Sequence, residues 1–304
     1  MLEGIHWIAG DKVTGSNLFY ASNPSTAEKL EPGFPEGTSE HVETAVSEAL
    51  KVHEQRHLFP EEVRIRLLKT IARNLQEMLP QIQQRGVLET GLPEGRFEAE
   101  MGRTCQQLLS FAETVESGFF REPVLQSADP DRSPLPRPDL RRRMIPLGPI
   151  AVFGASNFPL AFGVAGGDTA SAFAAGCPVV AKGHPAHPGV CELVGKAISS
   201  AVAESGLPKG TFSLIHGESH EVGVGLTSHP GIAAVGFTGS QAGGLALWRL
   251  AAQREVPIPV FAEMGSANPV FVLPEAIAER GNDIATGLAA SVLLGVGQFC
   301  TCPG

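Results

Sequence analysis

The sequence has few basic residues, few aromatic residues and no long hydrophobic run. Lys and Arg together number 23 against 32 Asp and Glu, which gives a formal charge of −9. Binding to nucleic acid needs clustered cations that displace phosphate counterions, so no nucleic-acid partner is expected. The one basic run, Arg141-Arg142-Arg143, is short and is typical of a solvated strand or loop face.

Membrane and export signals are also missing from the sequence. The N-terminus, MLEGIHWIAGDK, contains Glu3 and Asp11 and no sustained apolar stretch, so neither a signal peptide nor a transit peptide is expected. The longest stretch of low polarity, Ile284 to Phe299, is shorter than the roughly 20 apolar residues that a membrane span needs. We therefore expect a cytoplasmic location and no membrane partner.

The cysteines are odd in number and irregularly spaced, which favours reduced thiols over a disulfide framework. Metal binding is not expected either. The pairs Cys300-x-Cys302 and His184-x-x-His187 offer two ligands each, whereas zinc sites need three or four. The five cysteines are Cys105, Cys177, Cys191, Cys300 and Cys302.

The first 126 residues have a helical pattern after some short extended pieces. The chain has 304 residues, 43% of them hydrophobic, enough for more than one domain. Thr38 is a good N-cap for the first helix, and apolar residues recur at helical spacing. None of these helices carries evident chemistry. The predicted helices are Thr38 to Val52, Glu61 to Arg73, Leu75 to Glu89 and Glu94 to Gly118.

The pattern changes after a segment rich in Pro, Arg and Asp, residues 127–149, which predicts an exposed connection or edge strand. Beyond it, apolar runs alternate with segments of helical length. This alternation predicts an α/β fold with a parallel sheet covered on both faces, an architecture that binds nucleotides. The predicted strands are residues 150–153, 178–181, 211–215, 233–237, 258–262 and 269–273, followed by a helix from near Asp283.

A glycine-rich turn follows the predicted strand at residues 233–237. In Gly239-Ser240-Gln241-Ala242-Gly243-Gly244 the glycines let backbone N–H groups approach a pyrophosphate at a helix N-terminus. The spacing is not that of the standard dinucleotide fingerprint, Gly-x-Gly-x-x-Gly. A tight structural turn is the alternative.

Two further candidates end predicted strands. Gly154-Ala155-Ser156-Asn157 follows the strand at residues 150–153, and the Asn157 amide could stabilise an oxyanion. Alternatively, Asn157 caps a helix that starts near Pro159. Lys182 closes the strand at residues 178–181 and could reach ribose hydroxyls or phosphate, or it could simply be solvated.

The last candidates are a carboxylate and a thiol. Glu263 ends an apolar strand, where burial would raise its pKa and suit it to act as a general base. Alternatively, its side chain turns to solvent. Cys300 follows glycines at positions 295 and 297, in a loop that would leave a nucleophilic thiolate accessible. Taken alone, the pattern favours a buried, inert cysteine.

In this order the motifs resemble the aldehyde dehydrogenase superfamily, from about Asn23 to the last residue. Residues 152–189 and 236–244 look like the branch that oxidises α-ketoglutarate semialdehyde (2,5-dioxovalerate). The motifs that carry the resemblance are Asn157, Lys182, Phe237-Thr238-Gly239-Ser240, Glu263-Met264-Gly265 and Gly297-Gln298-Phe299-Cys300.

The resemblance implies a Rossmann-like sheet and oxidation of an aldehyde by NAD(P). Cys300 would attack the carbonyl, Asn157 would hold the oxyanion, and Glu263 would deprotonate the water that releases the thioester. The alternatives are oxidation of a long-chain or other aldehyde and transfer of the thioester to coenzyme A. Lys182 would bind the adenine ribose, and Gly239 and Ser240 the pyrophosphate. The other implied cofactor contacts are Gly154, Ala155, Ser156, Phe237, Thr238, Gly244, Met264 and Gly265.

The cofactor and the layout are implied in the same way. Pro185 stands where many NAD-using relatives have a glutamate, which favours NADP and leaves NAD possible. Residues 1–126 and 147–263 would form the dinucleotide-binding domain, and residues 127–146 an oligomerisation segment. Residues 264–304 would begin the catalytic domain of a homo-oligomer, a dimer or tetramer. Family members continue well past the nucleophile, which implies a truncated chain, inactive alone. A non-catalytic nucleotide-binding fragment is the alternative.

Overall fold

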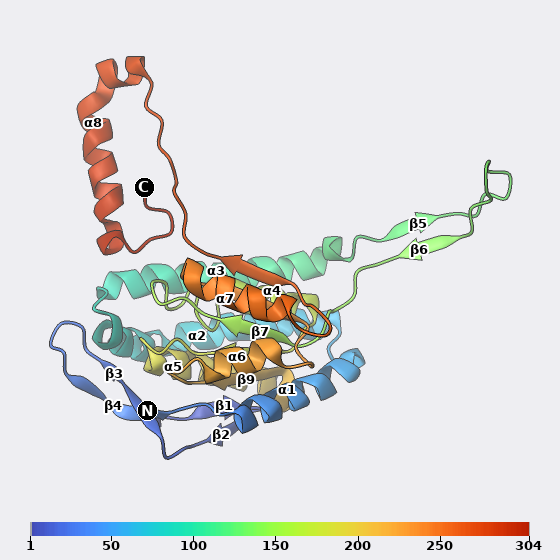
Figure 1. Ribbon diagram of the computed structural model, residues 1–304, viewed down its shortest axis with the longest axis horizontal. Coiled ribbons are helices and arrows are strands. Elements are labelled where there is room, and N and C mark those ends of the chain that lie inside the picture. The colour runs from blue at the N-terminus through green and yellow to red at the C-terminus, as the bar shows by residue number, and fades with distance from the viewer. Residues whose placement is uncertain (1, 304) are drawn as a thin grey trace.

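A sheet of seven strands forms the centre of the computed structural model, which describes residues 2–303 (Figure 1). The strand order is β11-β10-β7-β8-β9-β1-β2. The first five strands run parallel, and β1 and β2 extend the sheet by antiparallel pairing. The predicted α/β class with a parallel sheet is confirmed. The bounds are His6–Ile8 (β1), Asp11–Val13 (β2), Ile150–Phe153 (β7), Val179–Lys182 (β8), Phe212–Ile215 (β9), Ala234–Thr238 (β10) and Val260–Glu263 (β11).

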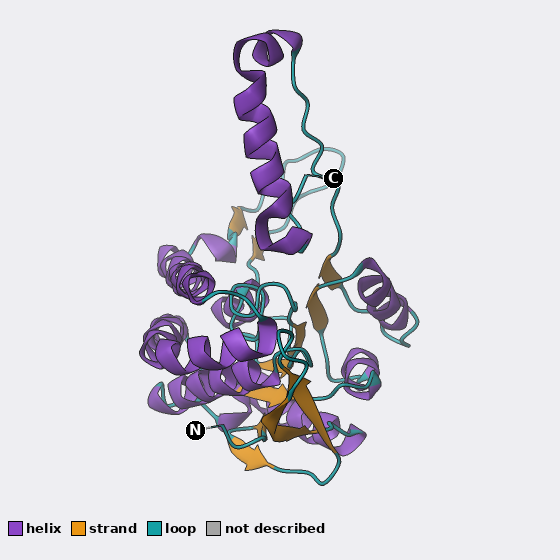
Figure 2. Cartoon of the chain, turned by 90° about the vertical axis from the view of Figure 1, so that its left-hand side faces the viewer, coloured by secondary structure: helices purple, strands orange, loops and turns teal. Residues whose placement is uncertain are grey.

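Helices cover both faces of the sheet (Figure 2). Because side chains alternate along a strand, Val152 packs into the core under α2 to α5, whereas Ala151 and Phe153 pack into the core under α1, α6 and α7. None of the helices within residues 2–303 has the length and apolarity to cross a membrane. The bounds are Ser39–Glu54 (α1), Glu61–Thr90 (α2), Glu94–Ser117 (α3), Gly167–Ala175 (α4), Pro188–Glu204 (α5), Glu221–Ser228 (α6), Gln241–Ala252 (α7) and Pro274–Leu293 (α8).

The N-terminal helices mostly follow the sequence pattern. Thr38 caps α1 by accepting a hydrogen bond from the His41 N–H, as predicted. The predicted break between two helices near Asn74 is wrong, because α2 is continuous through it. The Asn74 amide donates to the Ala197 carbonyl at 3.3 Å and to Glu204 at 3.0 Å, so its polar group is satisfied inside the helix layer.

Two hairpins lie outside the main sheet. Leu18–Ser22 (β3) pairs with Lys29–Pro35 (β4) near the N-terminus. Val124–Gln126 (β5) pairs with Leu140–Arg142 (β6) in an arm that projects from the body (Figure 1). This arm confirms the predicted exposed connection. Short 3-10 turns occupy Arg56–Leu58 (η1), Phe119–Arg121 (η2), Lys209–Thr211 (η3) and Leu294–Gly297 (η4).

The C-terminal segment differs most from the prediction. Residues 269–273 form no strand, and α8 begins at Pro274 rather than near Asp283, with non-helical backbone at Arg280. Helix α8 stands away from the body (Figures 1 and 2). No residue from 261 to 303 is buried, so this segment is placed by few contacts.

Candidate active site at the carboxyl edge of the sheet

A cavity of about 1010 Å³ opens where β7, β8 and β10 end, and the chain around Cys300 closes one side of it. This is the edge at which ligands bind in open α/β sheets. Twelve of the fourteen predicted site residues line the cavity; the two that do not are Glu263 and Gly244. The twelve are Gly154, Ala155, Ser156, Asn157, Lys182, Phe237, Thr238, Gly239, Ser240, Met264, Gly265 and Cys300.

Lys182 lies at the end of the cavity formed by β8 and the loop at residues 217–220. Its ammonium donates a hydrogen bond to the Gly217 carbonyl at 2.6 Å. Burial lowers the pKa of this ammonium, and the carboxylates of Glu36 and Glu218 partly oppose that shift. The alternative of a freely solvated lysine is therefore wrong. The ammonium is held where it can bind the oxygens of a ligand.

The glycine-rich turn joins β10 directly to α7, as the sequence predicted. The Ser240 hydroxyl caps α7 by accepting the Gly243 N–H at 3.1 Å. A Cβ at Gly239 would lie 2.7 Å from the Phe237 ring, so any side chain there would have to displace that ring. The helix N-terminus faces the cavity edge with unpaired N–H groups, which suits an anion.

Gly244 has a different role from the predicted one. It is buried and does not line the cavity. A Cβ at this position would lie 2.6 Å from the Met264 sulfur. Gly244 therefore lets α7 pack against the chain that follows β11, outside the cavity lining.

Asn157 lies in the turn after β7 and points toward the cysteine loop. The helix predicted to start near Pro159 begins only at Gly167, so the helix-cap alternative for Asn157 is wrong. Its side-chain amide donates to the carbonyl of Gln298, two residues before Cys300. The turn itself is fixed by His187, whose Nε2 lies 3.0 Å from the Ala155 carbonyl. An amide donor and a thiol thus share one wall of the cavity.

Cys300 is half-buried and accessible from the cavity. Its own carbonyl accepts hydrogen bonds from the Ser266 hydroxyl and, at 2.6 Å, from the Asn268 amide. By contrast, Cys191 is fully buried, and burial raises the pKa of its thiol to about 12. Cys300 is therefore not the buried, inert cysteine of the alternative interpretation.

Helix α3 contributes to the site although its sequence showed no chemistry. The Arg96 guanidinium donates to the Asn157 carbonyl at 3.1 Å and to Glu100 at 2.7 Å. It also lies 4.3 Å from the centre of the Phe158 ring and 4.4 Å from that of Phe299. Arg96 therefore joins the Asn157 turn to the Cys300 loop. The one sequence signal was the Arg-Glu pair at i,i+4 spacing.

Glu263 ends β11 as predicted, but its burial was predicted wrongly. β11 is the edge strand of the sheet, and the Glu263 side chain is exposed and outside the cavity lining. Its carbonyl accepts the Gly239 N–H at 3.0 Å, which ties β11 to the glycine-rich turn. The residues that follow, Met264 to Ser266, do line the cavity. The carboxylate thus lies beside the site but is turned toward solvent.

Two of the histidines near the cavity are packed into the fold. His184 and His187 stack with ring centres 5.4 Å apart, and burial lowers the pKa of His184 to about 3. Within residues 2–303 no three His, Cys, Asp or Glu side chains gather as metal ligands.

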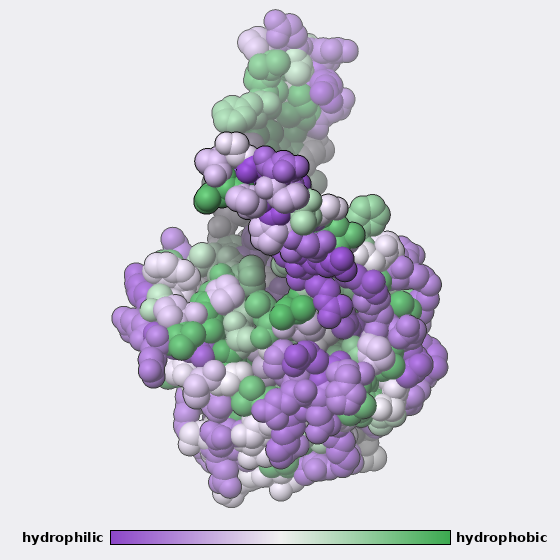
Figure 3. Space-filling model, turned by 90° about the vertical axis from the view of Figure 1, so that its right-hand side faces the viewer, coloured by the Kyte–Doolittle hydropathy of each residue, from purple (hydrophilic) through white to green (hydrophobic). Residues whose placement is uncertain are grey.

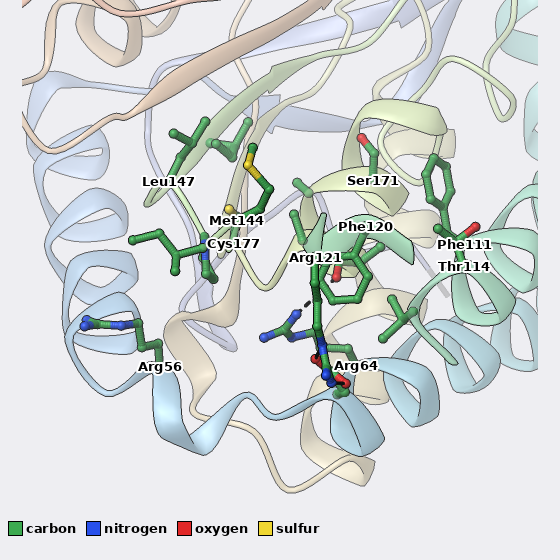
Figure 4. Close-up of a pocket in the computed structure, with 18 of the residues that line it drawn as sticks. Arg56, Arg64, Phe111, Thr114, Phe120, Arg121, Met144, Leu147, Ser171 and Cys177 are labelled. Atoms are coloured by element: carbon green, nitrogen blue, oxygen red, sulfur yellow. Dashed lines mark hydrogen bonds and ion pairs between the residues drawn. The ribbon is translucent and has the colours of Figure 1, made fainter. Parts of the chain in front are cut away.

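A second cavity of about 830 Å³ lies between α2, α3, α4 and the chain leading to β7 (Figure 4). It contains none of the predicted site residues, and its wall includes an ion pair between Arg121 and Glu61. Apolar side chains gather on this face of the molecule below the projecting arm, Met144 and Leu147 among those that are exposed (Figure 3). Burial raises the pKa of Cys177 in this wall. The chemistry therefore concentrates in the first cavity.

Comparison with known proteins yields one family. Residues 7–304 match the aldehyde dehydrogenase family. The chain is 48% identical over its whole length to α-ketoglutaric semialdehyde dehydrogenase 2 of Azospirillum brasilense, of which it covers 58%. It is 47% identical to α-ketoglutaric semialdehyde dehydrogenase of Acinetobacter baylyi, with 89% of this chain and 51% of that protein aligned. The chain thus spans about half the length of the curated relatives it matches.

The fold is also similar to that of a solved aldehyde dehydrogenase. A crystal structure of aldehyde dehydrogenase C from Pseudomonas syringae, a mutant in complex with NAD+ and octanal, superposes with a TM-score of 0.85. Sequence identity is 23%, and the alignment covers 100% of this chain and 59% of the other. At this identity the match establishes the shared fold.

Proposed function

The chain belongs to the aldehyde dehydrogenase family, and we propose that the protein oxidises an aldehyde to the carboxylic acid with a nicotinamide dinucleotide. The substrate we propose is α-ketoglutarate semialdehyde, after the named relatives at 47% and 48% identity. One observation carries the proposal. The Cys300 thiol and the Asn157 amide share a cavity with the glycine-rich turn at a helix N-terminus.

The residues of the cavity fit a dinucleotide. Lys182 would bind the adenine ribose, and the turn at Gly239 and Ser240 would hold the pyrophosphate against the N-terminus of α7. A side chain at Gly239 would collide with Phe237, which keeps the approach to the backbone open. When bound, the nicotinamide supplies the hydride acceptor.

The chain's own residues would perform the covalent steps. The Cys300 thiolate attacks the aldehyde carbon, and the Asn157 amide donates to the oxyanion that forms. After the hydride leaves, the acyl group remains on Cys300 as a thioester. Glu263 takes a proton from water, the hydroxide adds to the thioester, and the carbon–sulfur bond breaks to release the acid. For this step the exposed Glu263 side chain must turn toward the cavity.

We propose NADP as the preferred cofactor and NAD as a second one. Pro185 lines the Lys182 end of the cavity, so no carboxylate at that position repels a 2′-phosphate. His220 lines the same end, at the N-terminus of α6. The Glu218 carboxylate, also in the lining, would repel a 2′-phosphate, so we retain NAD as the second cofactor.

The layout implied by the resemblance also remains a proposal. We place the dinucleotide-binding domain at residues 1–126 and 147–263 and the start of the catalytic domain at residues 264–304. The projecting arm within residues 127–146 would pair with another copy in a homo-oligomer, and the protein would act in the cytoplasm. The exposed leucines Leu135 and Leu140 of the arm support an oligomerisation role.

One observation favours a second candidate function, dinucleotide binding with little turnover. No residue from 261 to 303 is buried, so the loop that carries Cys300 is placed by a few polar contacts. The dinucleotide end, in contrast, is formed by the packed sheet. Transfer of the acyl group to coenzyme A is the remaining alternative, and the presence of Glu263 argues against it.

The test compares two cysteines of the same loop. Cys300→Ala should abolish aldehyde-dependent formation of NAD(P)H, followed at its absorbance band, and leave dinucleotide binding intact. Cys302→Ala, the matched control, should keep most of the activity because its thiol faces the carbonyls of Ser291, Val292 and Leu294 at 3.7 to 4.0 Å. Activity that survives Cys300→Ala would refute the proposal. Binding of dinucleotide without turnover in the unmodified protein would establish the second candidate.

A further inference from the structure

Helix α3 places two arginines beside the Cys300 end of the cavity. Within residues 2–303, one of them is paired with a carboxylate and the other is not. Arg96 and Arg103 lie seven positions apart, or about two helical turns, so they share one face of the helix. Both approach the Phe158 ring, at 4.3 Å for Arg96 and 6.0 Å for Arg103. Their surroundings are otherwise opposite.

Arg96 is half-buried and paired with a carboxylate. Glu100 accepts its Nε–H at 2.7 Å, and the side chains are 14% and 4% exposed. The second oxygen of Glu100 accepts the backbone N–H groups of Leu160 at 3.1 Å and Ala161 at 3.3 Å. Both carboxylate oxygens are therefore engaged. Glu100, although three residues from Arg103, pairs with Arg96 and with the backbone and forms no ion pair with Arg103.

Arg103 is exposed and forms no ion pair within the part of the chain that the structure describes. Its guanidinium carbon lies 4.9 Å from the centre of the Phe162 ring, close enough for a cation–π contact. Phe162 and Phe158 pack edge to face at 5.3 Å, and both rings line the cavity. Arg103 is thus an exposed cation beside a ring of the cavity wall. Its side chain lies outside the cavity lining and must turn past the edge of the Phe162 ring to reach a ligand in the cavity.

The same rings lead to the nucleophile. Phe158 follows Asn157 in the chain, and its ring lies 4.9 Å from that of Phe299, the residue before Cys300. A substrate whose aldehyde carbon meets the Cys300 sulfur would extend along these rings. Apolar walls cannot bind a carboxylate at its far end, because burying an unpaired charge is costly. The Lys182 ammonium is committed to the dinucleotide end.

We propose that Arg103 binds the free carboxylate of the substrate and thereby selects semialdehydes that carry an acid group. The inference rests on the proposed aldehyde oxidation and adds the group that recognises the substrate class. A planar guanidinium can form two parallel hydrogen bonds with a carboxylate. Helix α3 would then use Arg96 to assemble the site and Arg103 to choose its substrate.

The test compares two five-carbon aldehydes, α-ketoglutarate semialdehyde, which has a carboxylate, and pentanal, which has none. Arg103→Met should lower kcat/KM for the semialdehyde about 10- to 100-fold, mainly through KM, because a charge-assisted hydrogen bond is lost. The rate with pentanal should stay unchanged. Arg103→Lys should restore part of the selectivity. Gln106→Met, on the exposed part of the same helix, should leave both rates unchanged.

Equal losses with both aldehydes, or no loss with either, would overturn the inference, provided that the melting temperature of Arg103→Met is unchanged. If the unmodified protein oxidises neither aldehyde, the proposed function fails separately. The carboxylate site is then measured by calorimetric titration of α-ketoglutarate. At least tenfold weaker binding by Arg103→Met supports the site. Equal binding by both proteins, or no binding by either, refutes it.

Discussion

The two ends of the candidate active site are constructed in different ways. At the Lys182 end, the walls are the carboxyl ends of β7, β8 and β10, whose side chains pack in the two cores. At the Cys300 end, one wall is the C-terminal segment, in which no residue from 261 to 303 is buried. That wall is located by hydrogen bonds from Asn157 and Asn268 and by the stacking of Arg96 on Phe299.

This contrast separates binding from chemistry. A site fixed by buried strands has its geometry before a ligand arrives, whereas a loop fixed by a few surface contacts opens at low free-energy cost. Changes at the Lys182 end should therefore alter dinucleotide affinity. Changes at the Cys300 end should alter the rates of the covalent steps and leave affinity and global stability nearly constant.

Among changes that keep the Cys300 nucleophile, Glu263→Gln should have the largest effect. If Glu263 is the base of deacylation, steady turnover should fall about 10²- to 10⁴-fold. The first burst of NAD(P)H, which reports hydride transfer, should remain. Rapid-mixing absorbance measurements separate these two phases. Dinucleotide affinity should not change, because the Glu263 side chain lies outside the cavity lining.

Glu255→Gln is the matched control for this change, since Glu255 is another exposed carboxylate shortly before β11. It should leave both the burst and steady turnover unchanged. Loss of the burst itself in Glu263→Gln would contradict the role of Glu263 as the base of deacylation.

The second effect concerns the opposite end of the site. Lys182→Met should weaken dinucleotide binding about 10- to 100-fold, because a charged group loses its hydrogen bonds to the ligand. At saturating cofactor the rate of the covalent steps should be nearly unchanged. Titration followed by protein fluorescence or calorimetry gives the affinity.

Lys209→Met, at an exposed lysine paired with Asp11, is the control for removing one positive charge. It should bind dinucleotide as the unmodified protein does. An unaltered affinity in Lys182→Met would contradict the inference that the Lys182 end determines dinucleotide binding.

The same contrast explains which features the sequence could predict. The strands at the Lys182 end are runs of apolar residues, and the strand, glycine-rich turn and helix around Ser240 are local in sequence. Thr38 was recognisable as a cap because a cap needs only its own helix. These features depend on near neighbours, and they occur where predicted.

The features that escaped prediction depend on distant residues. The exposure of Glu263 follows from the position of β11 at the sheet edge, which strand order decides. The contact of Arg96 with Asn157 joins residues 61 positions apart. Helix α2 continues past Asn74 because α5 supplies partners more than 120 residues away. A pattern read from one sequence reports near neighbours along the chain and does not show contacts between distant residues.

The smallest expected effect is at Asn268, which holds the Cys300 loop from the segment after β11. Its amide donates to the carbonyls of Cys300 at 2.6 Å and Cys302 at 3.0 Å, and its φ of 40° is one that asparagine tolerates. Asn268→Ala should slow the burst by up to about tenfold, since a neutral hydrogen bond contributes about 1 kcal/mol. The melting temperature should not change, because the residue is exposed.

Asn268→Asp separates the two properties of this residue. Aspartate keeps the shape and tolerates the same φ but has no N–H to donate, so its burst should slow as much as that of Asn268→Ala. A full burst in Asn268→Asp, with a slow one in Asn268→Ala, would assign the effect to backbone conformation. The amide bonds to the Cys300 loop would then not be what places the nucleophile.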